Sequence, residues 1–175
     1  MKLLYSIMFL SFFSCSGQEK LHTETILTRL ARVTSKDVES GRVFNRNSYI
    51  PITKRLEPEI LIINQDKNKL TYSLQGSISS SGHSIYRVNK IRFEKGERAA
   101  DTLTLKYFVE IKKIPGKEGA NVRGENYRQQ AAFKVPKDVN VIHIELYEEH
   151  SHKGENAKKE KSKLVAQQNI DFSAK

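Results

Sequence analysis

The amino-acid sequence predicts an all-β fold, an antiparallel β-sandwich of about seven strands of the immunoglobulin-like or transthyretin-like kind. Two observations predict it. From about residue 58 onward, apolar and polar residues alternate with period two, which gives each strand one face for a core and one for water. Turn-forming residues separate neighbouring runs, as in Gln65-Asp66-Lys67-Asn68 and Pro136-Lys137-Asp138.

Four runs show this alternation most clearly, and their apolar faces are the predicted core. The residues on these faces are Leu70, Tyr72, Leu74, Gly76 and Ile78; Leu103, Leu105, Tyr107, Val109 and Ile111; Tyr127, Ala131, Phe133 and Val135; and Leu164, Ala166, Ile170 and Phe172. The phenol groups of the three tyrosines therefore need hydrogen-bond partners inside the core.

Three further runs complete the set. Residues 59–64 are apolar on both faces, which predicts a central strand. In residues 139–148, Ile142, Ile144 and Leu146 share one face. The parity of the apolar residues changes within 84–93, which predicts a β-bulge near Asn89-Lys90.

Residues 21–57 carry a weaker pattern. Ile26, Leu30 and Val33 fit a helical spacing, while Leu27, Ala31 and Val33, with many β-branched neighbours, also fit a strand. The all-β remainder favours the strand for residues 23–34. The stretch from Ser35 to Pro58 is expected to be a long polar crossing loop.

The first fifteen residues have the composition of an export signal. Lys2 precedes an apolar run from Leu3 to Phe13, which is shorter than the about 20 residues that span a bilayer. Cys15, the one cysteine of the chain, stands where this run ends. A single cysteine excludes an intramolecular disulfide framework and a cysteine-rich zinc site.

Ser14-Cys15 at the end of that run resembles the lipobox of bacterial lipoprotein precursors, and the relaxed residues Phe12 and Phe13 resemble those of Bacteroidota. The resemblance implies a signal peptide over 1–14, a diacylglyceryl thioether on Cys15 and an acyl group such as palmitate on its amine. The alternative is a secretory signal that is cut after Ser16. The polar residues after Cys15 predict that the acylated cysteine and a flexible tether cover 15–22. Residues 23–175 contain no internal repeat and no domain linker, so they are expected to form one sandwich domain.

Charge identifies the candidate contact surface. The chain has 30 Lys+Arg against 20 Asp+Glu, so anionic partners are favoured. Between the last two predicted strands lies a basic segment, which is expected either to contact anionic headgroups or to be a solvated loop. Its lysines are Lys153, Lys158, Lys159, Lys161 and Lys163. The Gly-containing loop 112–126 is a second recognition candidate.

No catalytic constellation or cofactor site is predicted. His150-Ser151-His152 has a weak metal-ligand spacing, His83 fits a turn, and His143 fits a half-exposed sheet position. The aromatic residues do not alternate with Lys and Arg as a base-stacking surface would require, so no nucleic-acid binding is expected.

The lipoprotein resemblance, with Ser16 and not Asp after Cys15, implies an outer-membrane lipoprotein, lipid-anchored on the periplasmic face or the cell surface. We expect a non-catalytic binding or structural subunit of an envelope protein assembly, with the bilayer and an envelope protein as partners. The alternative is a lipoprotein that binds a glycan or small molecule.

Overall fold

The computed structural model describes residues 17–80, 84–114, 122–151 and 162–173, and every regular element in these ranges is a β-strand. The prediction of an all-β protein is therefore confirmed. Within the same ranges no helix could cross a bilayer. The strands are β1 (Gly17–Gln18), β2 (His22–Lys36), β3 (Val43–Pro51), β4 (Glu59–Asp66), β5 (Lys69–Ser79), β6 (Ile85–Ala99), β7 (Thr102–Ile114), β8 (Val122–Lys134), β9 (Val141–Ser151) and β10 (Lys163–Asp171).

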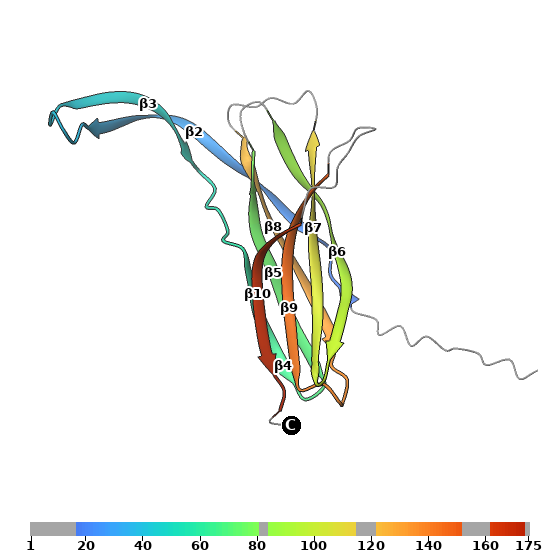
Figure 1. Cartoon of the computed structure of the whole chain (residues 1–175). Coiled ribbons are helices and arrows are strands. Elements are labelled where there is room, and N and C mark those ends of the chain that lie inside the picture. The colour runs from blue at the N-terminus through green and yellow to red at the C-terminus, as the bar shows by residue number, and fades with distance from the viewer. Residues whose placement is uncertain (1–16, 81–83, 115–121, 152–161, 174–175) are drawn as a thin grey trace, which may run out of the picture.

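The strands form two sheets (Figure 1). The first has the order β3-β2-β8-β5-β4, with β1 also paired to β8, and all of its pairs are antiparallel. The second has the order β10-β9-β7-β6. Its central pair, β7 and β9, is parallel, so the expectation of a purely antiparallel fold is wrong here. The chain crosses to the first sheet as β8 between these strands, so β7 and β9 run in the same direction.

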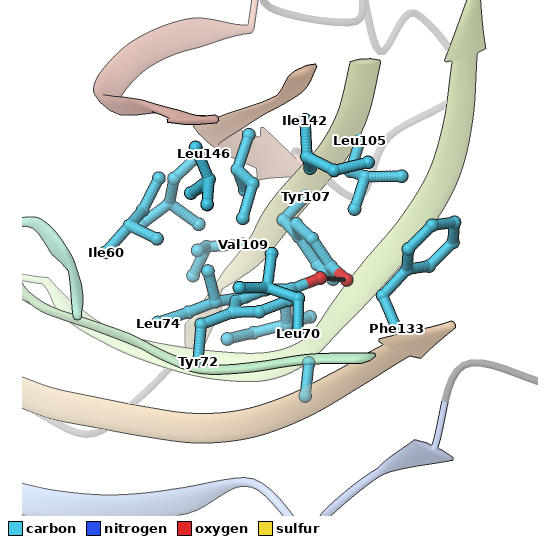
Figure 2. Close-up of a cluster of buried hydrophobic side chains, with 14 of the residues drawn as sticks. Ile60, Leu70, Tyr72, Leu74, Leu105, Tyr107, Val109, Phe133, Ile142 and Leu146 are labelled. Atoms are coloured by element: carbon cyan, nitrogen blue, oxygen red, sulfur yellow. Dashed lines mark hydrogen bonds between the residues drawn. The ribbon is translucent and has the colours of Figure 1, made fainter. Parts of the chain in front are cut away.

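The two sheets pack through their apolar inner faces. Figure 2 shows the hydroxyl groups of Tyr72 on β5 and Tyr107 on β7 meeting between the sheets, where they hydrogen-bond. Burial raises the pKa of Tyr107 to about 12 and also raises the pKa of Tyr72 and of Tyr127. All three tyrosines are buried, as predicted.

The predicted core faces of β5, β7, β8 and β9 are confirmed by burial of their apolar side chains. The buried residues are Leu70, Leu74 and Ile78; Leu103, Leu105, Val109 and Ile111; Ala131, Phe133 and Val135; and Ile142, Ile144 and Leu146. The predicted turn at Lys67-Asn68 joins β4 to β5.

Irregular positions in the strands are partly as expected. The register of β6 against β7 shifts between Val88 and Lys90, which confirms the predicted bulge. In β10, Ile170 is buried as predicted, but Leu164 is 42% exposed. The register of β10 against β9 shifts between Leu164 and Ala166, which turns Leu164 away from the core.

Two expectations for the first sixty residues need correction. Residues 23–34 form a strand, as favoured, but 43–51 also form one, and this strand, β3, pairs with β2 instead of belonging to a loop. Residues 59–64 belong to an end strand of the first sheet, not to a central one. Of the apolar residues of β4, Ile60 is buried in the core, whereas Leu61, Ile62 and Ile63 are exposed.

Candidate functional site

The sequence-predicted contact residues lie mostly outside the described ranges. Cys15, Lys153, Lys158, Lys159 and Lys161 are all outside them, as are His83, His152 and residues 115–121.

Of the predicted contact lysines, Lys163 alone lies within the described ranges. It is exposed at the start of β10, opposite Glu148 on β9.

The two described histidines of interest lie in the second sheet. His143 is half-buried as predicted, with its ring nitrogens bonded to Asn169 and Glu145. The ring of His150 packs edge-on against Tyr86 with centroids 5.6 Å apart. Within the described ranges, no three His, Cys, Asp or Glu side chains come close enough to hold a metal ion.

Residues 17–19, which we expected to belong to a flexible tether, are hydrogen-bonded along one edge of β8. Gly17 pairs with Ala132 and Gln18 with Ala131. The Glu19 amide donates to the Gln130 carbonyl at 3.0 Å. A chain anchored at Cys15 would therefore be held close to this end of the sheet, with little free length between them.

The feature that sequence reasoning missed is an arm, defined here as residues 28–51. Residues His22 to Leu27 of β2 pair with β8, but from Thr28 onward β2 leaves the sheet and pairs only with β3. Nine register pairs connect Thr28↔Pro51 to Lys36↔Val43. At about 3.4 Å per residue, this ribbon is about 27 Å long. Figure 1 shows it standing clear of both sheets.

The tip of the arm is a closed turn. The Asp37 carboxylate accepts hydrogen bonds from the backbone amides of Glu39 at 3.1 Å and Ser40 at 2.6 Å. These bonds, that from Ser40 above all, lower the pKa of Asp37. Gly41 has a φ of +68°, which glycine adopts without strain. The arm is therefore a preformed hairpin.

Both faces of the arm are exposed, and each carries apolar side chains. Leu30 and Tyr49 form one cross-strand pair on the first face, and Phe44 lies opposite Ser35 on the other. Leu30 is 58% exposed, Val43 64% and Phe44 46%. An isolated two-stranded hairpin is at best marginally stable in water. Such a surface is typical of a segment that a partner covers.

The paired strands of the arm are also strongly basic. Residues 28–36 and 43–51 carry Arg29, Arg32, Lys36 and Arg46, and no carboxylate. The Arg123 guanidinium lies 5.6 Å from the centre of the Tyr49 ring and adds a cation at the base of the arm. The arm therefore presents apolar and positive groups together.

An ion pair between the buried Glu125 carboxylate and the partly exposed Arg87 guanidinium fixes the root of the arm. Glu125 on β8 is 3% exposed and lies opposite Thr25 on β2. Arg87 of the second sheet donates to Glu125 Oε1 at 2.7 Å and to Thr25 Oγ1 at 2.9 Å. The Val88 amide donates to Glu125 Oε2 at 2.8 Å, directly beside the β6 bulge. We call Arg87, Glu125, Thr25 and the Val88 amide the root clamp.

The segment between β3 and β4 ties the other side of the arm to the outer face of the first sheet. Asn126 of β8 donates to the Lys54 carbonyl at 2.8 Å and accepts from the Leu56 amide at 3.2 Å. Arg55 donates to Ser79 Oγ and to the Arg123 carbonyl, both at 2.8 Å. The arm thus leaves the sheets from a rigid base.

The outer face of the second sheet carries a network of ion pairs. Arg92 pairs with Glu94, with Glu110 at 3.4 Å and with Glu149 at 3.0 Å, and its guanidinium lies 4.4 Å from the centre of the Phe108 ring. These charges neutralise one another across neighbouring strands. We assign the network a structural role.

Comparison of the chain with protein families, curated proteins and solved structures finds no match. A sequence signal for the arm did exist: the turn residues Asp37 to Gly41 separate two runs that are rich in β-branched and aromatic residues, the pattern of a hairpin.

Proposed function

We propose that this chain is an exported lipoprotein, acylated on Cys15 and anchored in the outer membrane, which acts as a non-catalytic binding or structural subunit of an envelope protein assembly. The single observation that carries the docking role is the arm, a preformed basic ribbon with exposed apolar side chains on both faces. A surface of this composition is typical of protein–protein contact. The lipobox-like Ser14-Cys15 carries the anchoring role.

The positions of the anchor and the arm on β8 support this arrangement. Gly17, two residues after Cys15, pairs with Ala132, whereas Leu27, the last residue before the arm, pairs with Val122. Ten residues of β8 separate these two points, about 34 Å. An acylated Cys15 would therefore hold one end of the sheets at the bilayer and leave the arm at the other end.

Two lysines beside Gly17 support a bilayer at that end. Lys69 of β5 and Lys134 of β8 are directly opposite each other and line a hollow together with Gly17. Like charges directly opposite each other are destabilising, and an anionic headgroup would relieve the repulsion. The basic segment from Lys153 to Lys163 is a second candidate for anionic contact, but at a different place. Lys163 lies opposite Glu148 near the end of β9, which is toward the arm and not beside Gly17.

We also propose that the two packed sheets are a β-sandwich of the immunoglobulin-like or transthyretin-like class. The crossing from β7 through β8 to β9 supports it, because connections between the two sheets are typical of such sandwiches.

The second candidate function is binding of a glycan or small molecule. A hollow of about 390 Å³ lies between the start of β2, β8 and Leu56, lined by the polar side chains of His22, Glu24, Asn126 and Arg128. Its polar groups could orient a small hydroxylated ligand. A glycan array probed with the chain tests this candidate directly.

The docking role is tested by affinity recovery of the acylated protein from gently solubilised membranes, followed by mass spectrometry. Phe44→Ser in the arm is compared with Leu164→Ser, a matched control with similar exposure on β10 (46% against 42%). We expect discrete envelope proteins with the parent and with Leu164→Ser, and their loss with Phe44→Ser. Equal recovery by both variants would contradict the proposal.

The anchoring role is tested with Cys15→Ser. The variant should lose the mass of the acyl groups and should be released from the membrane or misprocessed, since a diacylglyceryl anchor holds by about 0.8 kcal/mol per buried methylene. A variant that stays tightly membrane-bound with an unchanged mass would contradict it.

A further inference from the structure

The strand at the other end of the first sheet has the complementary surface to the arm. β4 is the end strand beyond β5, and its side chains Leu61, Ile62 and Ile63 are 38%, 38% and 51% exposed. End strands present unpaired backbone N–H and C=O groups, which favour pairing with another strand. An exposed apolar end strand therefore calls for a partner.

The charges of the two surfaces are opposite. Residues 57–66, which contain β4, carry Glu57, Glu59 and Asp66 and no cation. The paired strands of the arm carry four cations and no carboxylate. Each surface therefore combines apolar side chains with charges of one sign. The arm is positive and the β4 surface is negative, so the two surfaces attract each other.

We propose that the arm of one molecule docks along the β4 edge of a second copy of the same chain, with β3 adding to the first sheet of the neighbour. This inference rests on the proposed function, in that it names the protein that the arm contacts. β3 has nine residues and β4 has eight, so the two end strands match in length. The pairing continues the sheet of one copy into the arm of the next.

The contact is between molecules. β3 and β4 lie at opposite ends of the first sheet, separated by β2, β8 and β5, and the arm leads away from the sheets (Figure 1). Because the two surfaces differ, the contact is head-to-tail, and it generates a ring or a row of copies. Either product suits a structural subunit.

Pairing of one arm with another arm is disfavoured by the same charges. It would bring two positively charged ribbons together, and juxtaposed like charges weaken association strongly. The carboxylates Glu57 and Glu59 of the β4 edge attract the arm instead. Regular pairing is expected over Glu59–Ile62, since the register of β4 shifts between Ile62 and Asn64.

The test is a charge-swap experiment on the Cys15→Ser chain, exported with a substituted signal so that neither acyl groups nor the apolar run from Leu3 to Phe13 is present. Sedimentation velocity at concentrations up to about 100 µM covers a micromolar dissociation constant. One variant reverses the arm (Arg32→Glu with Arg46→Glu) and the other reverses the edge (Glu57→Lys with Glu59→Lys). Lys95→Glu with Lys137→Glu, at exposed positions elsewhere, is the control. Circular dichroism establishes that each variant is folded.

The proposal predicts self-association of the parent and of the control, and a dissociation constant raised about tenfold or more in each reversed variant. Mixing the two reversed variants in equal amounts should restore association, because an acidic arm then meets a basic edge. A parent that stays monomeric over the whole range would overturn the proposal, and so would a mixture that does not associate.

Failure of this inference is distinguishable from failure of the docking role. A monomeric parent whose envelope partners are still lost with Phe44→Ser would overturn self-docking and leave the arm as the site for a different protein. Partners that are retained with Phe44→Ser would overturn the docking role itself.

Discussion

Replacing Glu125 by glutamine should weaken the root clamp and lower the stability of the whole domain. Glu125 is buried and its two carboxylate oxygens accept separate hydrogen bonds, one from the Arg87 guanidinium and one from the Val88 amide. Glutamine keeps the shape but has only one acceptor oxygen. Its amide nitrogen would face either Arg87 or the Val88 N–H, donor against donor.

The magnitude follows from these contacts. A hydrogen bond to a charged group contributes about 1.5–3 kcal/mol. The Arg87 side chain is 39% exposed, so solvent screening keeps its further Coulombic contribution below about 1 kcal/mol. We therefore expect Glu125→Gln to lower the free energy of unfolding by about 2–3 kcal/mol.

The assay is equilibrium unfolding in urea. With a slope of about 2 kcal/mol per molar, the midpoint should fall by about 1 M without a change in slope. Glu97→Gln, at an exposed position of β6, is the control and should leave the midpoint unchanged. A loss of less than about 0.5 kcal/mol for Glu125→Gln, or a loss equal to that of the control, would refute the reasoning. Amide hydrogen exchange should also become faster in His22 to Leu27 of β2, which the root clamp holds against β8.

Three further predictions concern the core. Gly124→Ala should prevent folding, as seen by circular dichroism. The reason is that φ is +140° at Gly124 and an added Cβ would lie 1.8 Å from the Ile78 carbonyl oxygen. A folded variant of parental stability would contradict this prediction. Tyr72→Phe should lower the free energy of unfolding in urea by about 1–2 kcal/mol because it leaves the Tyr107 hydroxyl unpaired. The double variant with Tyr107→Phe should recover most of this loss. A double variant that loses as much as Tyr72→Phe alone, or the sum of the two single losses, would contradict the buried pair. Burial raises the pKa of Tyr107 to about 12, above the value of about 10 in the unfolded chain. The contribution of the protonated Tyr107 to the free energy of unfolding is therefore complete below about pH 10 and is lost as the pH rises toward 12. A urea midpoint that does not fall between about pH 10 and 12 would contradict this prediction.

Period-two alternation predicted the core well because it depends only on local geometry. Leu103, Leu105 and Tyr107 follow one another on one face of β7, and no distant residue is needed to infer their burial. The bulge after Val88 was predictable for the same reason, since a change of parity along one strand reveals an extra residue.

The arm could not be predicted in this way because no core sorts its side chains. In β3, Val43 and Phe44 are adjacent and both exposed, and Asn45 and Arg46 follow them, so the segment resembled a polar loop. The prediction of a central strand over residues 59–64 was wrong for the opposite reason. Residues that are apolar on both faces predict a strand buried on both sides, yet Ile62 and Ile63 lie exposed on an end strand.

The parallel pairing of β7 and β9 could not be predicted, because it follows from the position of β8 in the other sheet. That position is decided by contacts between residues far apart in the sequence. Alternation within each strand is the same for either direction. The turn residues Asp37 to Gly41 are enough to predict a hairpin, but its position clear of both sheets follows only from the folded chain.

The most direct test of the arm as a docking site is photocrosslinking in intact cells. A benzoylphenylalanine placed at position 44, in place of Phe44, is compared with the same group at Lys95, an exposed position of β6 away from the arm. We predict one or a few discrete protein adducts from position 44 and none of them from position 95. Adducts that are the same from both positions, or no protein adduct from position 44, would contradict the account.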